Sequence, residues 1–299
     1  MSFLACSLIQ LTAQHQASYM ANLACRITLL LLLEVFANPV QAQPKRIVSV
    51  NLCTDALLLS LAPKQHIVAV SQYASDDQRS PFAELAKDVP GVRVQAETIL
   101  ALKPDLVIAG QFGARETIKQ LQRLNIPVEK FAPAQNFAEL EAQILRLGNL
   151  LVEPEQAGEL VAQIQQLVNT LPPVASNIRG AMYLGRGVSP GRNTMEGHIL
   201  ELAGIENIAA TPLRKGITPF PLEEFIVARP EVLVLTDYHQ NTPTRAQGFS
   251  HHPLLRRMQQ RTVVLPAQLL TCAGGAWTTT AINRLREFTR QSHTVPEDL

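Results

Sequence analysis

The sequence predicts an α/β protein of two lobes, each a parallel-sheet α/β sandwich, bridged by one long α-helix. Three observations support this fold class. Short β-branched apolar segments alternate with helical patterns along most of the 299 residues. A helical pattern near the middle of the chain is long enough to join two cores. A similar stretch of sequence occurs on both sides of that helix, as expected if the two lobes share one plan.

The first 42 residues are predicted to be a signal peptide rather than part of the fold. Arg26 precedes an apolar run, Ile27 to Phe36, and the small-x-small sequence Val40-Gln41-Ala42 follows it. The run has about ten residues, whereas a helix that spans a bilayer needs roughly 20. We therefore expect cleavage after residues 1–42 and a mature, periplasmic chain from about Gln43.

Two alternatives for this segment stay open. Translation could start at Met20 rather than Met1, which would give a signal of ordinary length. The apolar run could also remain uncut as a membrane anchor. Cys25 precedes the run, so it is badly placed for a lipoprotein cleavage site.

Composition and charge exclude one class of partner. The chain is 46% hydrophobic and 17% charged, which is typical of a globular protein, and its formal net charge is only +1. No global field therefore favours nucleic acid or an anionic membrane surface. We expect no nucleic-acid partner.

Four strands are predicted before the central helix, with a helix over about residues 54–61 after the first of them. The strands are apolar on both faces, which is typical of a parallel sheet covered by helices on each side. Their ranges are Arg46–Val50, His66–Val70, Asp105–Ala109 and Ile126–Lys130.

The central helical pattern runs from Phe137 to Leu171, with a predicted break near Gly148 and a restart at Pro154. The second part has about eighteen residues and would be about 27 Å long. Pro172 ends it. We predict that this second part is the bridging helix.

Strands resume after the helix, and an amphipathic helix over about residues 279–289 closes the chain. The strand ranges are Ala181–Leu184, Val232–Leu235 and Thr262–Leu265. The predicted organisation is therefore an N-terminal lobe over residues 43–134, linking helices over 135–173 and a C-terminal lobe over 174–299.

The shared stretch comprises Glu97–Ile108 in the first lobe and Glu223–Val234 in the second. Both read, without a gap, as an acid, an apolar helical turn, a base, a proline, an acid and a buried strand. A short helix that ends at a Pro-acid turn and leads into a parallel strand explains each shared residue. The repeat predicts two similar lobes.

The chain resembles the periplasmic binding proteins whose lobes are bridged by a single helix, a class that includes binding proteins for cobalamin, ferric siderophores and haem. The resemblance rests on Pro44–Asn51, Leu102–Ile108 and Leu202–Ala209. It implies a soluble, monomeric substrate-binding subunit of an ABC importer. Such a protein captures a metal-chelate nutrient, cobalamin or a ferric siderophore, between its lobes and delivers it to a membrane permease. It is not an enzyme and carries no cofactor.

In that class the ligand lies on loops after the carboxyl ends of the strands, as in open α/β sheets generally. Aromatic side chains on these loops could cover a planar macrocycle or a catecholate, although core packing is the ordinary alternative for each. Arginines there could bind carboxylates or phosphate of an anionic chelate, or could simply be solvated. Asn51 and His239 lie on the same loops. The candidate contacts are thus Asn51, Tyr73, Phe112, Arg115, Arg186, Arg192, Tyr238, His239 and Trp277.

Cys53 and Cys272 also fall on predicted cleft loops, one in each lobe, and are counted among the candidate ligand contacts. Three alternatives are open for them. They could be inert small side chains, a disulfide between the lobes, or soft ligands to a bound metal. The sequence alone does not give the distance between them.

The repeat also places one acid at a matching position on each lobe, Glu97 and Glu223. In the class that this chain resembles, such acids dock against arginines of the permease, and a two-fold permease can hold one lobe with each subunit. Glu224 is a rival for the second position. An exposed acid without any partner is the alternative for each.

Two other functions were compared with metal-chelate capture. Haem binding needs only a tyrosine or histidine ligand, which Tyr73, Tyr238 or His239 could supply. An enzyme on the same scaffold is the third hypothesis, but the chain has no Gly-x-Ser-x-Gly, His-Glu-x-x-His or P-loop motif. Haem binding stays the closer alternative.

Overall fold

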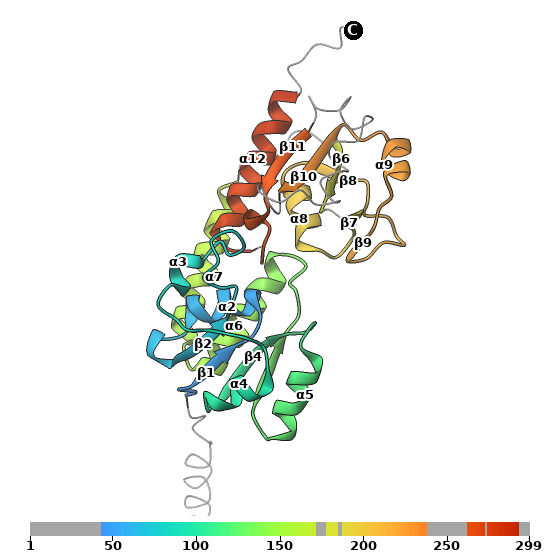
Figure 1. Ribbon diagram of the computed structural model, residues 1–299. Helices are drawn as coiled ribbons and strands as arrows, with labels where there is room; N and C mark the ends of the chain where they lie inside the picture. The colour runs from blue at the N-terminus through green and yellow to red at the C-terminus, as the bar shows by residue number, and fades with distance from the viewer. Residues whose placement is uncertain (1–42, 172–177, 185–186, 238–261, 273, 293–299) are drawn as a thin grey trace, which may run out of the picture. The chain divides into compact units, whose positions relative to one another are not determined.

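Two separate parallel sheets form the framework of the protein, one in each half of the chain (Figure 1). The computed structural model describes residues 43–171, 178–184, 187–237, 262–272 and 274–292. The predicted signal peptide lies outside these residues. Below, the N-terminal lobe means the first sheet with helices α2 to α5, and the C-terminal lobe means the second sheet with helices α8, α9 and α12.

The first sheet has the strand order β3-β2-β1-β4-β5, and all its pairs are parallel. Its central strands are buried along nearly their whole length, as predicted for strands covered on both faces. The short strand β3 was not predicted, because two residues give no periodic pattern. The strands are β1 Ile47–Ser49, β2 Ile67–Ser71, β3 Gly91–Val92, β4 Leu106–Gly110 and β5 Val128–Phe131.

Four helices connect these strands. Helix α2 begins two residues earlier than predicted, because Asn51 caps its first turn. The helices are α2 Leu52–Leu61, α3 Ala83–Ala86, α4 Ala96–Ala101 and α5 Arg115–Arg123, with a short 3₁₀ turn at Lys64–His66 before β2.

Helices α6 Phe137–Leu151 and α7 Pro154–Asn169 follow the first sheet. The predicted restart at Pro154 is confirmed, but the break lies after Gly148 and not at it, because α6 continues through this glycine to Leu151 and is capped by Val152, whose φ is 59°. A Cβ at Gly148 would overlap the side chain of Ala157 and lie 3.0 Å from the carbonyl oxygen of Glu153. The glycine therefore allows α6 and α7 to approach closely and does not interrupt the helix.

Helix α7 contacts both lobes. It packs against α2 and α6, which precede it in the chain, and against α12 Ala276–Ser292, which follows it. This arrangement agrees with the predicted bridging helix, although α7 ends at Asn169, two residues before Leu171. The exact boundaries 43–134, 135–173 and 174–299 stay a prediction.

The second sheet has the strand order β11-β10-β6-β8, again with parallel pairs only. A two-stranded antiparallel ribbon, β7–β9, accompanies it and was not predicted, since its strands have three residues each. The elements are β6 Ile178–Tyr183, β7 Val188–Pro190, α8 Met195–Leu202, β8 Ile205–Asn207, β9 Ile217–Pro219, α9 Leu222–Ala228, β10 Val232–Asp237 and β11 Thr262–Pro266, followed by a 3₁₀ turn at Ala267–Leu269.

The predicted repeat corresponds to the same topology in both sheets. The order β2-β1-β4-β5 of the first sheet matches β8-β6-β10-β11 of the second. Helix α4 leads into β4 and helix α9 leads into β10, as the shared stretch predicts. The matching bases after these helices, Lys103 and Arg229, both adopt left-handed backbone angles, with φ of 49° and 46°.

Hydrogen bonds repeat as well. The Asp105 amide donates to the carbonyl of Arg46 at 3.0 Å, and the Asp105 carboxylate accepts from the Arg46 amide at 3.0 Å. In the second lobe the Glu231 amide donates to the carbonyl of Arg179 at 2.7 Å, and the Glu231 carboxylate accepts from the Arg179 amide at 3.1 Å. The shared acid after the proline thus ties the end of the short helix to the neighbouring strand in each lobe.

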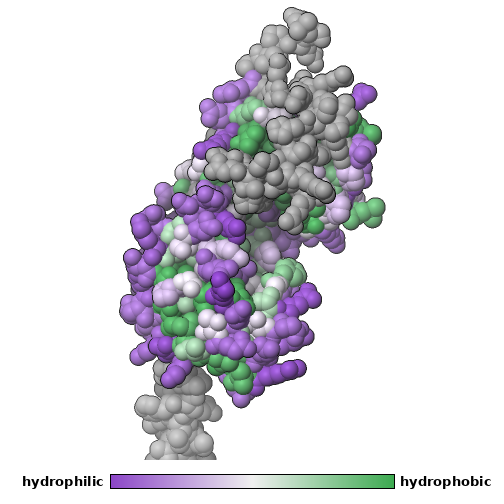
Figure 2. All heavy atoms as spheres, viewed as in Figure 1, coloured by the Kyte–Doolittle hydropathy of each residue, from purple (hydrophilic) through white to green (hydrophobic). Residues whose placement is uncertain are grey.

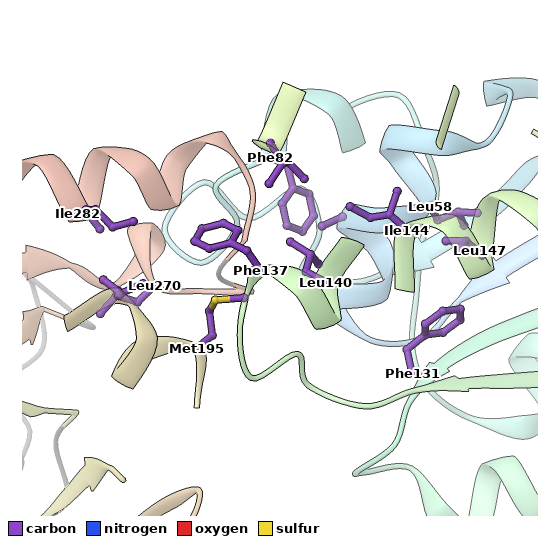
Figure 3. Close-up of a cluster of buried hydrophobic side chains, with 14 of the residues drawn as sticks. Leu58, Phe82, Phe131, Phe137, Leu140, Ile144, Leu147, Met195, Leu270 and Ile282 are labelled. Carbon is purple, nitrogen blue, oxygen red and sulfur yellow. The ribbon is translucent and has the colours of Figure 1, made fainter. Parts of the chain in front are cut away.

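One large apolar cluster includes residues of both lobes and of the two linking helices. Figure 3 shows it running from Leu270 and Ile282, in the C-terminal lobe, past Phe137 to Ile144 and Leu147 of α6. Phe137 also contacts His198 of α8, with ring centroids 5.9 Å apart. The lobes therefore share buried side chains near α6 and α7.

The described surface of the N-terminal lobe is mostly hydrophilic, with small scattered apolar areas on the face that Figure 2 shows. Among the described residues, no helix is long and apolar enough to cross a membrane.

Candidate functional site

The carboxyl ends of β1, β2 and β4 lie at one edge of the first sheet, because these strands are adjacent and parallel. Three predicted contact residues follow them directly: Asn51 after β1, Tyr73 after β2 and Phe112 after β4. This is the edge at which ligands bind in open α/β sheets. The structure therefore brings these three loops to the expected place.

Asn51 has a structural role there. Its side-chain oxygen accepts hydrogen bonds from the amides of Cys53 at 3.0 Å and Thr54 at 3.4 Å, which caps helix α2. A Cβ added at Gly110, the last residue of β4, would lie 3.0 Å from the Asn51 side chain. A side chain at position 110 would therefore crowd this cap. Because the side-chain oxygen of Asn51 caps the helix, its Nδ2 amino group is the part that remains for a ligand.

A buried acid lies directly behind this edge. The carboxylate of Asp55 accepts hydrogen bonds from the amide of Ser71 at 3.1 Å and from its hydroxyl at 2.5 Å. Burial raises the pKa of the Asp55 carboxyl to about 6, while hydrogen bonds from Ser49 and Ser71 act in the opposite direction. Asp55 was not among the predicted site residues, although an acid among the apolar residues of a helix that follows a buried strand was a usable signal.

Tyr73, Phe112 and Arg115 are accessible. Tyr73 is 43% exposed and Phe112 is 63% exposed, so neither is part of the core. The guanidinium of Arg79 lies 4.9 Å from the centre of the Tyr73 ring. Arg115 is the first residue of α5, is exposed, and has no ion pair within the described part of the chain. All three side chains are available to a ligand.

The C-terminal lobe contributes Arg192, an exposed residue directly after β7. Its backbone is fixed by hydrogen bonds with Arg214 at 2.9 Å and Gly216 at 2.8 Å. The other candidates of this lobe, Arg186, Tyr238 and His239, lie outside the described residues.

Cys53 and Cys272 form a disulfide bond, with their Cα atoms 4.9 Å apart. Cys53 is the second residue of α2 in the N-terminal lobe, and Cys272 lies between β11 and α12 in the C-terminal lobe. Of the three alternatives, the structure therefore has the disulfide between the lobes; two inert thiols are contradicted. As disulfide sulfurs the pair offers no thiolate to a metal.

Trp277 is used in packing. Its ring lies 5.9 Å from that of Phe82, and its indole N–H donates to the carbonyl of Thr271 at 3.2 Å. It is partly buried against the large apolar cluster. The core-packing alternative thus accounts for the contacts of Trp277, while Tyr73 and Phe112 keep exposed faces.

Two more contacts accompany the disulfide. The side-chain amide of Gln268 donates to the carbonyl of Asp77. Gly274, with φ of 132°, lies so close to Leu140 that a Cβ would overlap the leucine side chain. Together with Cys272 and Trp277, these residues belong to the described stretches 268–272 and 274–277, which contact the N-terminal lobe and α6. We call these stretches the contact segment.

Glu97 and Glu223 occupy equivalent positions, each the second residue of its helix, α4 or α9. Both are exposed and have no ion pair among the described residues. Glu224, the rival, forms an ion pair with Arg214, whose guanidinium also lies 5.0 Å from the centre of the Phe220 ring. The matching exposed acids are therefore Glu97 and Glu223.

No group of three or more histidine, cysteine, aspartate or glutamate side chains suited to a metal ion occurs within the described ranges. The site edge of the N-terminal lobe thus combines exposed aromatic rings, one arginine and a capped helix start. Flat apolar faces with nearby cationic and amide groups suit a large, partly planar and partly anionic small molecule.

Comparison with known proteins gives a family and several relatives. A family model described as periplasmic binding protein matches residues 47–260. The vitamin B12-binding protein of Yersinia pseudotuberculosis serotype O:1b (strain IP 31758) is 29% identical over 220 residues, covering 71% of this chain and 76% of the relative.

Solved structures have the same fold. The periplasmic haem-binding protein from Roseiflexus sp. RS-1, in its apo form, has a TM-score of 0.67 at 25% identity, covering 83% of this chain and 98% of that one. A protein of the ABC-type Fe³⁺-hydroxamate transport system from Saccharomonospora viridis has a TM-score of 0.62 at 22% identity, covering 83% and 94%. At the latter identity the likeness concerns the fold alone.

Proposed function

Because the chain belongs to the periplasmic binding protein family, we propose that it is the exported substrate-binding subunit of an ABC importer. It captures a metal-chelate nutrient, cobalamin or a ferric siderophore, between its lobes and delivers it to the permease. It acts as a binding protein without a catalytic step. The observation that carries the proposal is the edge of the first sheet, where Tyr73, Phe112 and Arg115 are exposed on loops after the strands.

The chemistry of this edge supports a chelate rather than a bare ion. The exposed rings of Tyr73 and Phe112 offer flat apolar surface, and Arg115 offers a guanidinium for a carboxylate or phosphate. A bare zinc or manganese ion would need several converging histidines or carboxylates, and the described residues form no such group. Two of the proteins named above are a vitamin B12-binding protein and a haem-binding protein, and both ligands are of this kind.

Haem is the second candidate ligand. The haem-binding protein from Roseiflexus is 25% identical to this chain. Tyr73 is 43% exposed at the candidate edge, and a tyrosine phenolate is a sufficient axial ligand for haem iron. Cobalamin, in contrast, places no requirement on Tyr73 beyond a flat contact surface.

Export to the periplasm is part of the proposal. The compact unit that contains both sheets begins at Gln43, the residue after the predicted cleavage site. The side chain of Gln43 donates hydrogen bonds to the carbonyl of Leu151 at 3.1 Å and to the carboxylate of Glu153 at 2.8 Å. A mature chain that starts here would keep its first residue attached to the end of α6.

Docking to the permease is assigned to Glu97 and Glu223. Each is exposed at the second position of a short helix, and the two helices are equivalent in the repeated unit. A two-fold permease could hold each lobe through one of these acids. Glu224 is a weaker candidate because Arg214 already engages it.

A ligand titration tests the proposed function. Cyanocobalamin, haemin and a ferric hydroxamate siderophore are each added to the protein, and fluorescence of Trp277, its one tryptophan, is recorded together with binding heat. We expect one of the three to bind with a dissociation constant at or below about 1 µM, or about −8 kcal/mol.

The Phe112→Ala and Arg115→Ala variants should weaken binding of that ligand, each by about tenfold, because they remove a contact but no part of the core. The matched control is Leu124→Ala, another exposed apolar residue at the opposite end of α5. The absence of binding by all three ligands, measured by heat as well as by fluorescence, contradicts the proposal. Tyr73→Phe separates the two ligand classes, since it should abolish an axial haem bond but spare a flat contact to cobalamin.

A further inference from the structure

The two lobes are linked covalently at two places. The chain passes from the first sheet to the second through α6 and α7. The Cys53–Cys272 bond joins them again, between the first turn of α2 and the contact segment, across a sequence separation of 219 residues. A crosslink across so long a stretch removes much of the freedom of the chain between its ends.

The second link limits how the lobes can move. Without the disulfide, the lobes would be connected through the linking helices and held together by noncovalent packing, which can loosen. A bond at a second point excludes every arrangement in which the Cα atoms of Cys53 and Cys272 separate beyond disulfide reach, about 7 Å. Separation of the lobes at this point is thereby prevented for as long as the bond is intact.

Noncovalent contacts accompany the disulfide at this point. Trp277 packs on Phe82, Gln268 donates to Asp77, and Gly274 touches Leu140. Cys272 itself has a left-handed φ of 50°, a backbone conformation that disfavours a side chain. The disulfide thus adds a covalent link to the noncovalent packing of the contact segment against the shared apolar cluster.

The bond is open to a reductant. Cys53 is exposed and Cys272 is half-buried. Cys53 lies at the N-terminus of the ten-residue helix α2, where its amide donates to Asn51. A helix N-terminus stabilises a thiolate, so Cys53 is a favourable leaving group when a thiolate attacks the sulfur of Cys272.

We propose that the Cys53–Cys272 bond is a redox-controlled tie that limits separation of the lobes and slows ligand release. A dithiol reductant opens it: the first reductant sulfur bonds to Cys272 and Cys53 leaves as a thiolate, which is then protonated. The second reductant sulfur displaces Cys272, so that the reductant becomes a disulfide and the protein holds two thiols. The effect on ligand release rests on the proposed function, whereas the restraint of the lobes by the disulfide does not depend on it.

The first measurement uses no ligand. Trp277 is the one tryptophan of the chain and belongs to the contact segment, so its quenching by acrylamide reports release of this segment. We expect the quenching constant to rise about twofold when dithiothreitol reduces the full-length protein, because the segment then loses its covalent link and can open locally. Cys53→Ser should show the higher value with and without reductant, and a Cys6→Ser, Cys25→Ser variant should respond as the wild type does.

The second measurement is the release rate of a bound probe from oxidised and reduced protein, with cyanocobalamin, haemin and a ferric hydroxamate tested in turn. We expect release about tenfold faster after reduction, equivalent to about 1.4 kcal/mol. If reduction leaves the quenching constant unchanged, the disulfide does not restrain the contact segment. If a probe that does bind is released at equal rates from oxidised and reduced protein, the disulfide does not slow ligand release. If none of the probes binds in either redox state, the proposed function is wrong. The quenching experiment still tests whether the disulfide restrains the contact segment, because it uses no ligand.

Discussion

Asp55 is the residue whose environment gives the sharpest prediction. Its carboxyl is completely buried beside Ser71, and burial raises its pKa to about 6. The folded state therefore binds this proton more tightly than the unfolded chain does. The corresponding stabilisation is fully present below about pH 4 and is lost as the pH rises through about 6.

For the wild type, we expect this group to lower the free energy of unfolding by about 2 kcal/mol between pH 4 and pH 7, from a pKa difference of about two. Urea unfolding across this range measures it, and the Asp55→Asn variant should lack this part of the pH dependence. Asp88→Asn is the matched control, because Lys64 lowers the pKa of this exposed acid. Equal pH profiles for the wild type and Asp55→Asn would show that the charge is not buried.

The residue scale also shows what sequence reasoning can give. Tyr73, Phe112 and Arg115 were predicted to be near the carboxyl ends of strands, because strand order follows from periodicity and the loops from strand ends. Trp277 and Cys272 have neighbours far away in sequence, namely Phe82 and Cys53. No local pattern encodes such contacts, so the packing of Trp277 and the disulfide required the structure.

At the scale of elements, Gly148 illustrates how a local signal can mislead. Glycine usually weakens a helix, so a break was predicted there. In the structure the position is helical because α7 comes too close for a side chain. Tertiary packing of α6 against α7 therefore outweighs the intrinsic preference of one residue.

The Gly148→Ala variant should be destabilised by about 1–3 kcal/mol, because overpacking against Ala157 exceeds the gain in helix propensity of about 1 kcal/mol. Gly158→Ala is the matched control. Gly158 is an exposed residue of α7 whose added Cβ would meet nothing within 4 Å, so this variant should be more stable by about 0.5–1 kcal/mol. Urea unfolding measures both, and a stabilised Gly148→Ala would rule out the close α6–α7 contact.

The repeated helix–turn–strand unit, Glu97–Ile108 and Glu223–Val234, could be predicted in more detail than the short strands of the two lobes. Matching acids, bases and prolines in the sequence correspond to matching hydrogen bonds of Asp105 and Glu231 and to left-handed Lys103 and Arg229. The strands β3, β7, β8 and β9 were not found, since two or three residues are too few for a period. The length of a strand, rather than its composition, therefore limits whether it can be predicted from the sequence.

At the scale of the whole molecule, the repeat supports a test of permease docking. A variant with Glu97→Ala and Glu223→Ala should bind ligand as the wild type does, because both acids are exposed and lie on helices outside the candidate ligand loops. Its affinity for the permease should fall by about tenfold or more, with loss of uptake in reconstituted vesicles. Ligand titration and uptake are measured on the same preparations.

Glu224→Ala is the control for this variant, because its acid is adjacent to Glu223 but already paired with Arg214. It should retain uptake. Reduced ligand affinity in the double variant, or full uptake by it, would remove Glu97 and Glu223 from the docking surface.

The bond between Cys53 and Cys272 has a consequence for biogenesis. Cys6 and Cys25 belong to the predicted signal, so a processed chain would carry only these two cysteines, and oxidation within it would have a single possible product. Cys272 follows Cys53 by 219 residues, so the thiol of Cys53 must wait until this whole stretch has been translocated. An oxidase would then suffice for maturation, and no isomerase would have an incorrect pairing to repair.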